Sequence, residues 1–272
     1  AGRVDGSGNL TKQGTARLSL SGANTTYSGT TRVLAGTLTA TGSGSALGSG
    51  AVQVSGGATL EIDNVALSTG GLTLNGRGVS GAGALRGSGT ASHTGTVTLA
   101  TASAIGAATL TDTLSLNNPV TGLGLTKVGS GTVNLSGSNR YVGGTTIEAG
   151  TLRLLGGATL PSLGAVNLTG SGILDLNNTN QSIGDLAGTV DTRIDLGSGD
   201  LTVTQAAAGS FAGRVAGSGD LTKQGTAQLS LSGASSGYSG TARVEAGTLV
   251  ATGSGSALGT GAVQVSDGAT LA

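Results

Sequence analysis

The chain has 272 residues, including 54 glycines, 2 prolines and no cysteine, and its 13 basic residues balance its 13 acidic residues. The scarcity of proline and the lack of a Gly-X-Y period exclude collagen, and zero net charge argues against a nucleic-acid partner, which needs a basic surface. No stretch approaches the roughly 18 consecutive apolar residues of a membrane helix, and no signal peptide stands at the start.

Short runs with an apolar residue at every second position recur along the chain, as expected for strands with one buried face. Clusters of glycine, serine and asparagine, which permit tight turns, separate these runs. No segment has the 3.6-residue period of a helix, so the chain is predicted to be nearly all β. In chain order the clearest runs are RLSLSG from residue 17, GTLTATG from 36, AVQVSGG from 51, GLTLNG from 71, TVTLAT from 96, DTLSLNN from 112, AVNLTG from 165 and DLTVTQ from 200.

One phrase occurs three times, starting at Leu10, Leu125 and Leu221. The intervals of 115 and 96 residues both divide into five or six turns of about 19–23 residues, the size of one turn of a β-solenoid. Residues 2–60 and 213–271 match without a gap at roughly four positions in five. All lysines and tyrosines of the chain lie in the three copies of the phrase: Lys12, Lys127, Lys223, Tyr27, Tyr141 and Tyr238.

A parallel β-solenoid explains this pattern, because each turn would hydrogen-bond to the turns above and below it, about 4.8 Å away. Inward residues of successive turns would then stack into a narrow aliphatic core, in agreement with an aromatic content of 1%. We expect an all-β, single-stranded parallel β-helix of about 12 turns over residues 1–272. Its repeat units are expected at residues 2–62, 123–176 and 213–271.

The repeated phrase resembles the passenger-associated transport repeat of bacterial autotransporters, which belong to type V secretion. The middle copy, LTKVGSGTVNLSGSNRYVGGTTIEAGTL from Leu125 to Leu152, is the most similar to it. The third copy departs from the repeat at Ser235, where an asparagine is expected, and the first copy has an extra residue at Thr25–Thr26. These differences fall in turns, where a solenoid tolerates change.

The resemblance implies a passenger domain that is exposed on the cell surface or secreted and that folds as a right-handed parallel β-helix. It also implies a C-terminal β-barrel translocator as a partner. Because the chain begins and ends inside the repeat, we interpret it as a fragment of a longer passenger without that barrel.

The function implied is that of an adhesin with a role in virulence. It would attach to a host-cell surface or an extracellular matrix component, or to identical passengers on neighbouring cells in aggregation and biofilm formation. Two alternatives remain: a passive stalk that displays a separate effector domain, and an enzyme acting on polysaccharide. We expect no enzymatic activity, no cofactor and no nucleic-acid partner.

The candidates for chemistry have structural interpretations. A single histidine, His93, cannot form a His-rich metal site, and no GxSxG motif accompanies it, so a surface or turn histidine is expected. On a strand, Asp191, Arg193 and Asp195 would share one face, and we expect a solvated face neutralised by the arginine. The alternatives are a calcium site and a pair of carboxylates for glycoside cleavage. The acids of this region are Asp185, Asp191, Asp195 and Asp200.

The repeated lysines and tyrosines are also expected to be structural. A tyrosine beside a glycine turn would cover the core, and a lysine would blunt strand association. A repeated binding stripe is the alternative for these six residues. Threonine-rich strands such as TLTAT are also found in ice-binding solenoids, but the repeat intervals here are too irregular for a flat array. No catalytic, cofactor-binding or metal-binding residue is therefore predicted.

Overall fold

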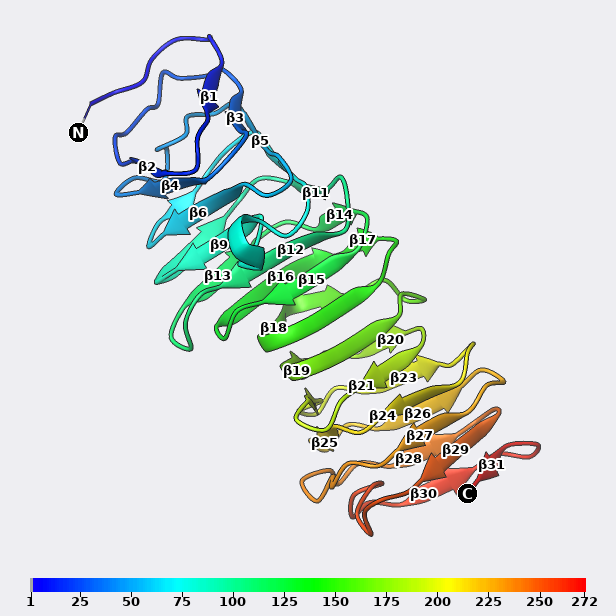
Figure 1. Cartoon of the computed structure of the whole chain (residues 1–272). Helices are drawn as coiled ribbons and strands as arrows, with labels where there is room; N and C mark the ends of the chain where they lie inside the picture. Colours follow the sequence, from blue (N-terminus) through cyan, green and yellow to red (C-terminus); the bar gives the residue numbers. More distant parts are fainter. Residues whose placement is uncertain (1) are drawn as a thin grey trace. The chain divides into compact units, whose positions relative to one another are not determined.

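The computed structural model describes residues 2–272, which form short β-strands joined by turns (Figure 1). Helical structure among these residues is limited to one three-residue 3-10 turn, η1 (Val79–Gly81), and none of them form a helix with the length and hydropathy of a membrane span. The chain divides into two compact units, Ala1–Gly143 and Gly144–Ala272, hereafter unit 1 and unit 2. Each unit is described separately.

Unit 1 is a coil in which most turns contain three short strands. One side of the coil is a seven-stranded sheet composed of β1 (Leu10–Lys12), β3 (Thr31–Val33), β5 (Ala51–Val54), β8 (Gly71–Leu74), β11 (Val97–Leu99), β14 (Val120–Gly122) and β17 (Arg140–Tyr141). The remaining sides are β2 (Arg17–Leu20), β4 (Thr37–Thr41), β6 (Thr59–Asp63), β7 (Ala66–Leu67), β9 (Leu85–Ser88), β10 (Thr90–His93), β12 (Ser103–Ala107), β13 (Thr113–Leu116), β15 (Leu125–Val128) and β16 (Thr132–Ser138).

Unit 2 has the same plan. A five-stranded sheet is composed of β20 (Gln181–Ile183), β23 (Leu201–Thr204), β26 (Leu221–Gln224), β28 (Ala242–Val244) and β30 (Val263–Val265). The other sides are β18 (Thr145–Thr159), β19 (Val166–Asp175), β21 (Leu186–Gly188), β22 (Arg193–Asp195), β24 (Gly209–Phe211), β25 (Arg214–Ala216), β27 (Leu229–Leu231), β29 (Thr248–Ala251) and β31 (Thr270–Leu271).

Successive turns pair in parallel and in register. Leu10 pairs with Thr31 in unit 1, and Leu201 pairs with Leu221 in unit 2, which gives turns of 21 and 20 residues. Between β8 and β9 the loop that contains η1 is inserted, so the same offset rises to 25 residues for Leu72. The predicted turn of about 19–23 residues is right for most turns and too short for this one. The seven-stranded and five-stranded sheets confirm the predicted parallel β-helix of about 12 turns.

Each unit has a core of small aliphatic side chains, because alternate residues of each strand point inward. In β8, for example, Leu72 and Leu74 are buried, while Gly71 and Thr73 are not. Unit 2 also accommodates Phe211, because the residue paired with it on the preceding turn is Gly188. An added Cβ at Gly188 would lie 2.5 Å from the Phe211 ring. The predicted bounds of the repeat units remain a prediction. The interpretation of residues 1–272 as one β-helical body also remains a prediction.

Glycine permits close stacking of the turns at one corner of each unit. In unit 2, an added Cβ at Gly240 would lie 2.0 Å from the carbonyl oxygen of Gly219, and one at Gly261 would lie 2.0 Å from that of Gly240. In unit 1, a Cβ at Gly50 would lie 1.9 Å from the carbonyl oxygen of Gly29. The atoms in the way are backbone atoms, so a methyl group would force the turns apart.

Gly240→Ala is expected to lower the free energy of unfolding by about 1–3 kcal/mol, the usual cost of inserting a methyl group into a closely packed site. Gly255→Ala is the matched control in the same unit, because its added Cβ would meet nothing within 4 Å. That substitution should be neutral, or stabilising by a few tenths of a kcal/mol through the unfolded state. Urea unfolding followed by circular dichroism measures the free energy of unfolding of both variants. Equal changes for Gly240→Ala and Gly255→Ala would contradict the prediction that the short distance between Gly240 and Gly219 excludes a methyl group.

Candidate functional site

The repeated Leu-Thr-Lys segment places a lysine inside the coil in each copy. Lys12, Lys127 and Lys223 lie on β1, β15 and β26, and they are 5%, 0% and 1% exposed. Each lysine stands two residues after an inward leucine, so strand alternation points it toward the core. Burial lowers the pKa of Lys127 to about 7 and also lowers the pKa of Lys223.

Backbone carbonyl oxygens surround the buried ammonium groups. The Nζ atom of Lys223 donates to three carbonyl oxygens at 2.8–2.9 Å, and that of Lys12 donates to three at 2.7–2.9 Å. In each set, two carbonyls follow the lysine and one belongs to the next turn: Gln13, Gly14 and Ala35 for Lys12, and Gln224, Gly225 and Ala246 for Lys223. The expectation that these lysines blunt strand association is therefore wrong, because all three are buried inside the coil, where Lys12 and Lys223 each join two turns.

The tyrosines of the repeat cover the core, as predicted. Tyr27, Tyr141 and Tyr238 are all buried. The hydroxyl of Tyr238 accepts a hydrogen bond from the amide of Leu221 at 3.0 Å and donates to the carbonyl oxygen of Thr241 at 2.8 Å. Burial raises the pKa of Tyr238 to about 12. A binding stripe built from the repeated lysines and tyrosines would need these side chains at the surface, and they are not there.

A buried polar side chain three residues before the tyrosine also links two turns. In the first copy, Asn24 accepts a hydrogen bond from the amide of Val4 at 2.9 Å and donates to the carbonyl oxygen of Ala46 at 2.7 Å. In the third copy, the hydroxyl of Ser235 accepts from the amide of Val215 at 3.0 Å. The change to serine therefore keeps the acceptor for the adjacent turn.

His93 is fully buried on β10, so the expectation of a surface or turn histidine is wrong. Its position is inward, in register with Leu67 on one neighbouring turn and Leu116 on the other. The Nε2 atom lies 2.9 Å from the hydroxyl oxygen of Thr69, and the Nδ1 atom has no hydrogen-bond partner among residues 2–272. Burial lowers the pKa of His93 to about 4, so the ring is neutral at neutral pH.

The acidic residues of the predicted cluster do not converge. Asp185 accepts hydrogen bonds from the amides of Ala206 and Ala207, and Asp200 accepts one from the amide of Asp220. No group of three or more His, Cys, Asp and Glu side chains within the described part of the chain could hold a metal ion. These carboxylates instead satisfy backbone amides of the next turn.

The predicted charged face is smaller than expected. Arg193 and Asp195 share β22 and form an ion pair, which agrees with a neutralised face. Asp191 lies in the turn before β22, so it is not part of that face. Burial raises the pKa of Asp195, opposed by the Arg193 guanidinium.

Sequence reasoning missed a buried ionic cluster on unit 1. Glu61 on β6 is buried and forms ion pairs with Arg17 on β2 and Arg86 on β9. These residues are separated by 44 and 25 residues, about two turns and one turn, so the turn length was the signal that could have found them. Each oxygen of this carboxylate is paired with an arginine, so the side chain is already engaged in contacts within the protein.

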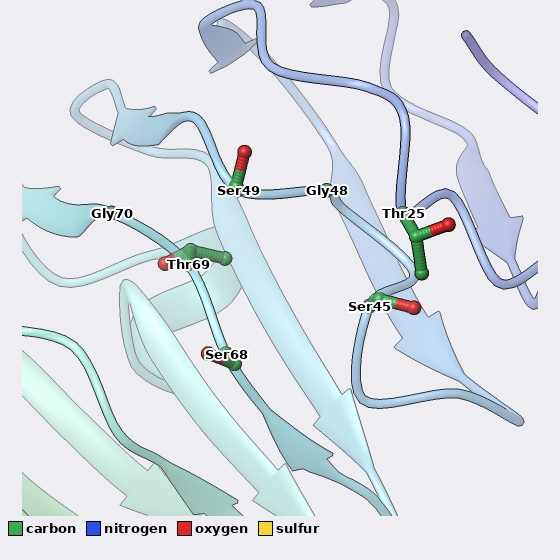
Figure 2. A pocket seen from close by; sticks show the side chains of 7 residues that line it. All are labelled: Thr25, Ser45, Gly48, Ser49, Ser68, Thr69 and Gly70. Carbon is green, nitrogen blue, oxygen red and sulfur yellow. The ribbon is translucent and has the colours of Figure 1, made fainter.

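An open recess of about 310 Å³, lined by serine, threonine and glycine, lies on unit 1 (Figure 2). We call it the hydroxyl recess, and its lining comes from three successive turns: Thr25, then Ser45, Gly48 and Ser49, then Ser68, Thr69 and Gly70. The hydroxyls of Ser45 and Thr69 have protein partners, Ser43 and His93. No charged or aromatic side chain lines the recess.

A second, smaller cleft of about 210 Å³ lies on unit 2. Its lining includes one acidic residue, Asp191, and one basic residue, Arg214. The lining residues are Val190, Asp191, Ala212, Arg214, Gly233 and Ala234. The two depressions differ in chemistry, since only this one offers charge.

Comparison with known proteins identifies the repeats. The passenger-associated-transport-repeat family model matches residues 10–40, 125–154 and 221–251. The chain is 37% identical over 223 residues to a protein described as adhesin BmaC autotransporter, from Brucella suis biovar 1 (strain 1330). This match covers 78% of the chain and 6% of that relative, so the chain spans a small part of its length. No solved structure shows significant similarity to the chain.

Lys223→Met is expected to lower the free energy of unfolding by about 1–3 kcal/mol, because it leaves buried carbonyl oxygens unpaired while it keeps most of the aliphatic stem. Urea unfolding of the whole chain measures the loss. A second readout is modification by an amine-reactive reagent, which should not label the three lysines before unfolding. Gln53→Lys, at an exposed position of β5, is the control that should be labelled at once. Rapid labelling of the native lysines would contradict their burial.

The stability of unit 1 should fall as the pH falls from about 6.5 to about 4. His93 titrates near 6.5 when unfolded and near 4 when folded, so over this range the unfolded chain binds more protons. The full loss is on the order of 3 kcal/mol. His93→Leu, which matches its leucine neighbours, should remove this part of the pH dependence and leave the part due to carboxylates. Urea unfolding at a series of pH values tests this, and identical pH profiles for the two chains would refute it.

Proposed function

Because the chain belongs to the autotransporter passenger domains that carry passenger-associated transport repeats, we propose that it acts as a non-enzymatic adhesin. The membership puts the chain at the bacterial cell surface or in the secreted fraction. The observation that carries the proposal is the identity of 37% over 223 residues with an autotransporter described as an adhesin. The proposed partner is a host-cell surface or extracellular matrix component, or an identical passenger on a neighbouring cell.

The outward residues of the seven-stranded sheet support contact along the coil. Gln53, Thr73, Thr98 and Thr121 stand in one row on β5, β8, β11 and β14, each in register with the next. Hydroxyl and amide groups at a spacing of one turn, about 4.8 Å, make individually weak polar contacts. Many such contacts between two surfaces, repeated between two cells, give strong attachment through avidity.

A passive stalk is the second candidate. It is favoured by the inward direction of the repeated lysines and tyrosines, which serve contacts between turns and leave the repeat without a repeated ligand contact. A polysaccharide-acting enzyme has less support. Glu61 is held between two arginines. Of the predicted acidic residues, Asp185 and Asp200 accept hydrogen bonds from backbone amides, and Asp195 forms an ion pair.

Beads coated with the chain should adhere to host-cell monolayers, or clump with one another, several-fold more than albumin-coated beads. A passive stalk predicts neither result, and an enzyme predicts the release of reducing ends from polysaccharide. Mixing coated with uncoated beads separates self-association from attachment to other surfaces.

Three glutamates in the outward row of unit 1, Thr73→Glu, Thr98→Glu and Thr121→Glu, map the contact. They should weaken adhesion if that face is used, because each adds charge to a row of neutral groups. The matched control is the corresponding row of unit 2, Ser182→Glu, Thr202→Glu and Thr222→Glu. Beads that neither adhere nor clump would contradict the adhesive role.

A further inference from the structure

We propose that the hydroxyl recess of unit 1 binds a neutral, polyhydroxylated ligand, namely one sugar ring of an uncharged glycan. This deepens the proposed adhesive function, on which its biological use rests, by naming a ligand class and a site. Four features of the recess carry the inference: its free hydroxyls, its lack of charge, its recurrence within the chain and its size.

Three hydroxyls around the recess are free to bind a ligand. The side chains of Thr25, Ser49 and Ser68 are exposed and make no hydrogen bond with any other described residue. Figure 2 shows that they come from three separate loop segments, and all three line the recess. Each hydroxyl donates one hydrogen bond and accepts two, the same capacity that each hydroxyl of a sugar presents.

The recess offers no charge to a ligand. Its lining has no Asp, Glu, Lys or Arg, and the histidine behind Thr69 is neutral at neutral pH. A charged group that enters such a site loses hydration and gains no counter-charge. A large apolar ligand is equally poorly matched, because no aromatic or branched aliphatic side chain lines the recess. The chemistry that remains is that of a neutral polyol.

Half of the recess recurs in the second matching copy, where hydroxyl groups are kept while side chains change. Thr25 corresponds to Ser236, and Ser49 corresponds to Thr260. Three other threonines of residues 2–60 lose the hydroxyl in this comparison, namely Thr26, Thr31 and Thr39, which correspond to Gly237, Ala242 and Val250. The remaining threonines are unchanged. The remaining lining residues of this half are unchanged, with Ser45 repeated as Ser256 and Gly48 as Gly259.

The backbone that presents these hydroxyls is also the same in both copies. Gly48 has φ 66° and Gly259 has φ 70°, a conformation that favours glycine. An added Cβ would lie 2.1 Å from the carbonyl oxygen of Tyr27 at the first glycine and 2.2 Å from that of Tyr238 at the second. The glycine before Ser49 and the glycine before Thr260 therefore have the same backbone conformation and the same close approach to the buried tyrosine.

The size and openness of the recess suit a single ring. A volume of about 310 Å³ is at the lower end of small-molecule sites. Because the hydroxyls are exposed and no aromatic ring stacks on the ligand, affinity for one ring should be millimolar. Weak binding of this kind becomes useful when many passengers face a glycan-covered surface.

The test uses the whole chain and four neutral probes, the methyl glycosides of glucose, galactose, mannose and N-acetylglucosamine, with sialic acid as the anionic comparison. Binding is measured by chemical-shift titration. At least one neutral glycoside should bind in the millimolar range, independently of salt. The triple variant Thr25→Val, Ser49→Ala and Ser68→Ala should bind at least tenfold more weakly. Ser171→Ala, at an exposed position of β19 in unit 2, should bind like the native chain, and circular dichroism checks that each variant is folded.

Several results would overturn the proposal: no neutral glycoside binds, the triple variant binds as well as the native chain, or sialic acid binds better in a salt-dependent way. A Ser/Thr/Gly peptide that shifts the recess resonances where no glycoside does would also overturn it. Bead adhesion and glycoside binding by the native chain separate the two proposals. If the native chain binds a glycoside but its beads do not adhere, the recess is supported and the adhesive role is refuted. If its beads adhere but it binds no glycoside, the recess proposal alone is refuted.

Discussion

Parallel backbone hydrogen bonding between successive turns is the interaction on which the rest of the structure depends. It fixes the register, so that Leu201 always stands beside Leu221 and each side chain meets its counterpart one turn away. Buried polar groups then find their partners on the adjacent turn. Lys223 reaches the carbonyl oxygen of Ala246, and the hydroxyl of Tyr238 accepts from the amide of Leu221. The narrow core contains few aromatic side chains, and these hydrogen bonds between turns supply part of the stability that a larger core would provide.

The fold could be predicted because alternation and repetition agree at every level. The direction of the lysines and of His93 could also have been predicted. Lys127 stands two residues after the inward Leu125, and His93 stands two residues after the buried Ala91. Strand alternation alone therefore points the three repeated lysines and His93 inward. The general preference of lysine and histidine for the surface points the opposite way to this local pattern. A coil with a narrow interior reverses that preference wherever backbone carbonyls lie close enough to receive an ammonium group.

The depressions and the ionic cluster could not be predicted with the same ease, because they depend on which turns are neighbours. The hydroxyl recess forms where Thr25, Ser49 and Ser68 meet across three turns, and no local pattern indicates that their loops enclose a space. The cluster around Glu61 needs Arg17 two turns earlier and Arg86 one turn later. Both require the register of irregular turns, one of which is lengthened by the loop that contains η1.

Inward residues therefore stabilise the contacts between turns, whereas outward residues determine the chemistry of the surface. The matching copies keep the residues that join turns, such as Lys12 and Lys223, whereas exposed positions change chemistry: Leu34 corresponds to Glu245, and Gly56 to Asp267. A passenger built this way can alter its surface from one turn to the next without disturbing its stability, since outward side chains make few contacts with the core. Specificity for a partner should then reside in the outward positions, where the copies differ. Outward positions that keep their chemistry while changing residue, as Thr25 and Ser49 do, are the ones where a ligand explains more than the fold does.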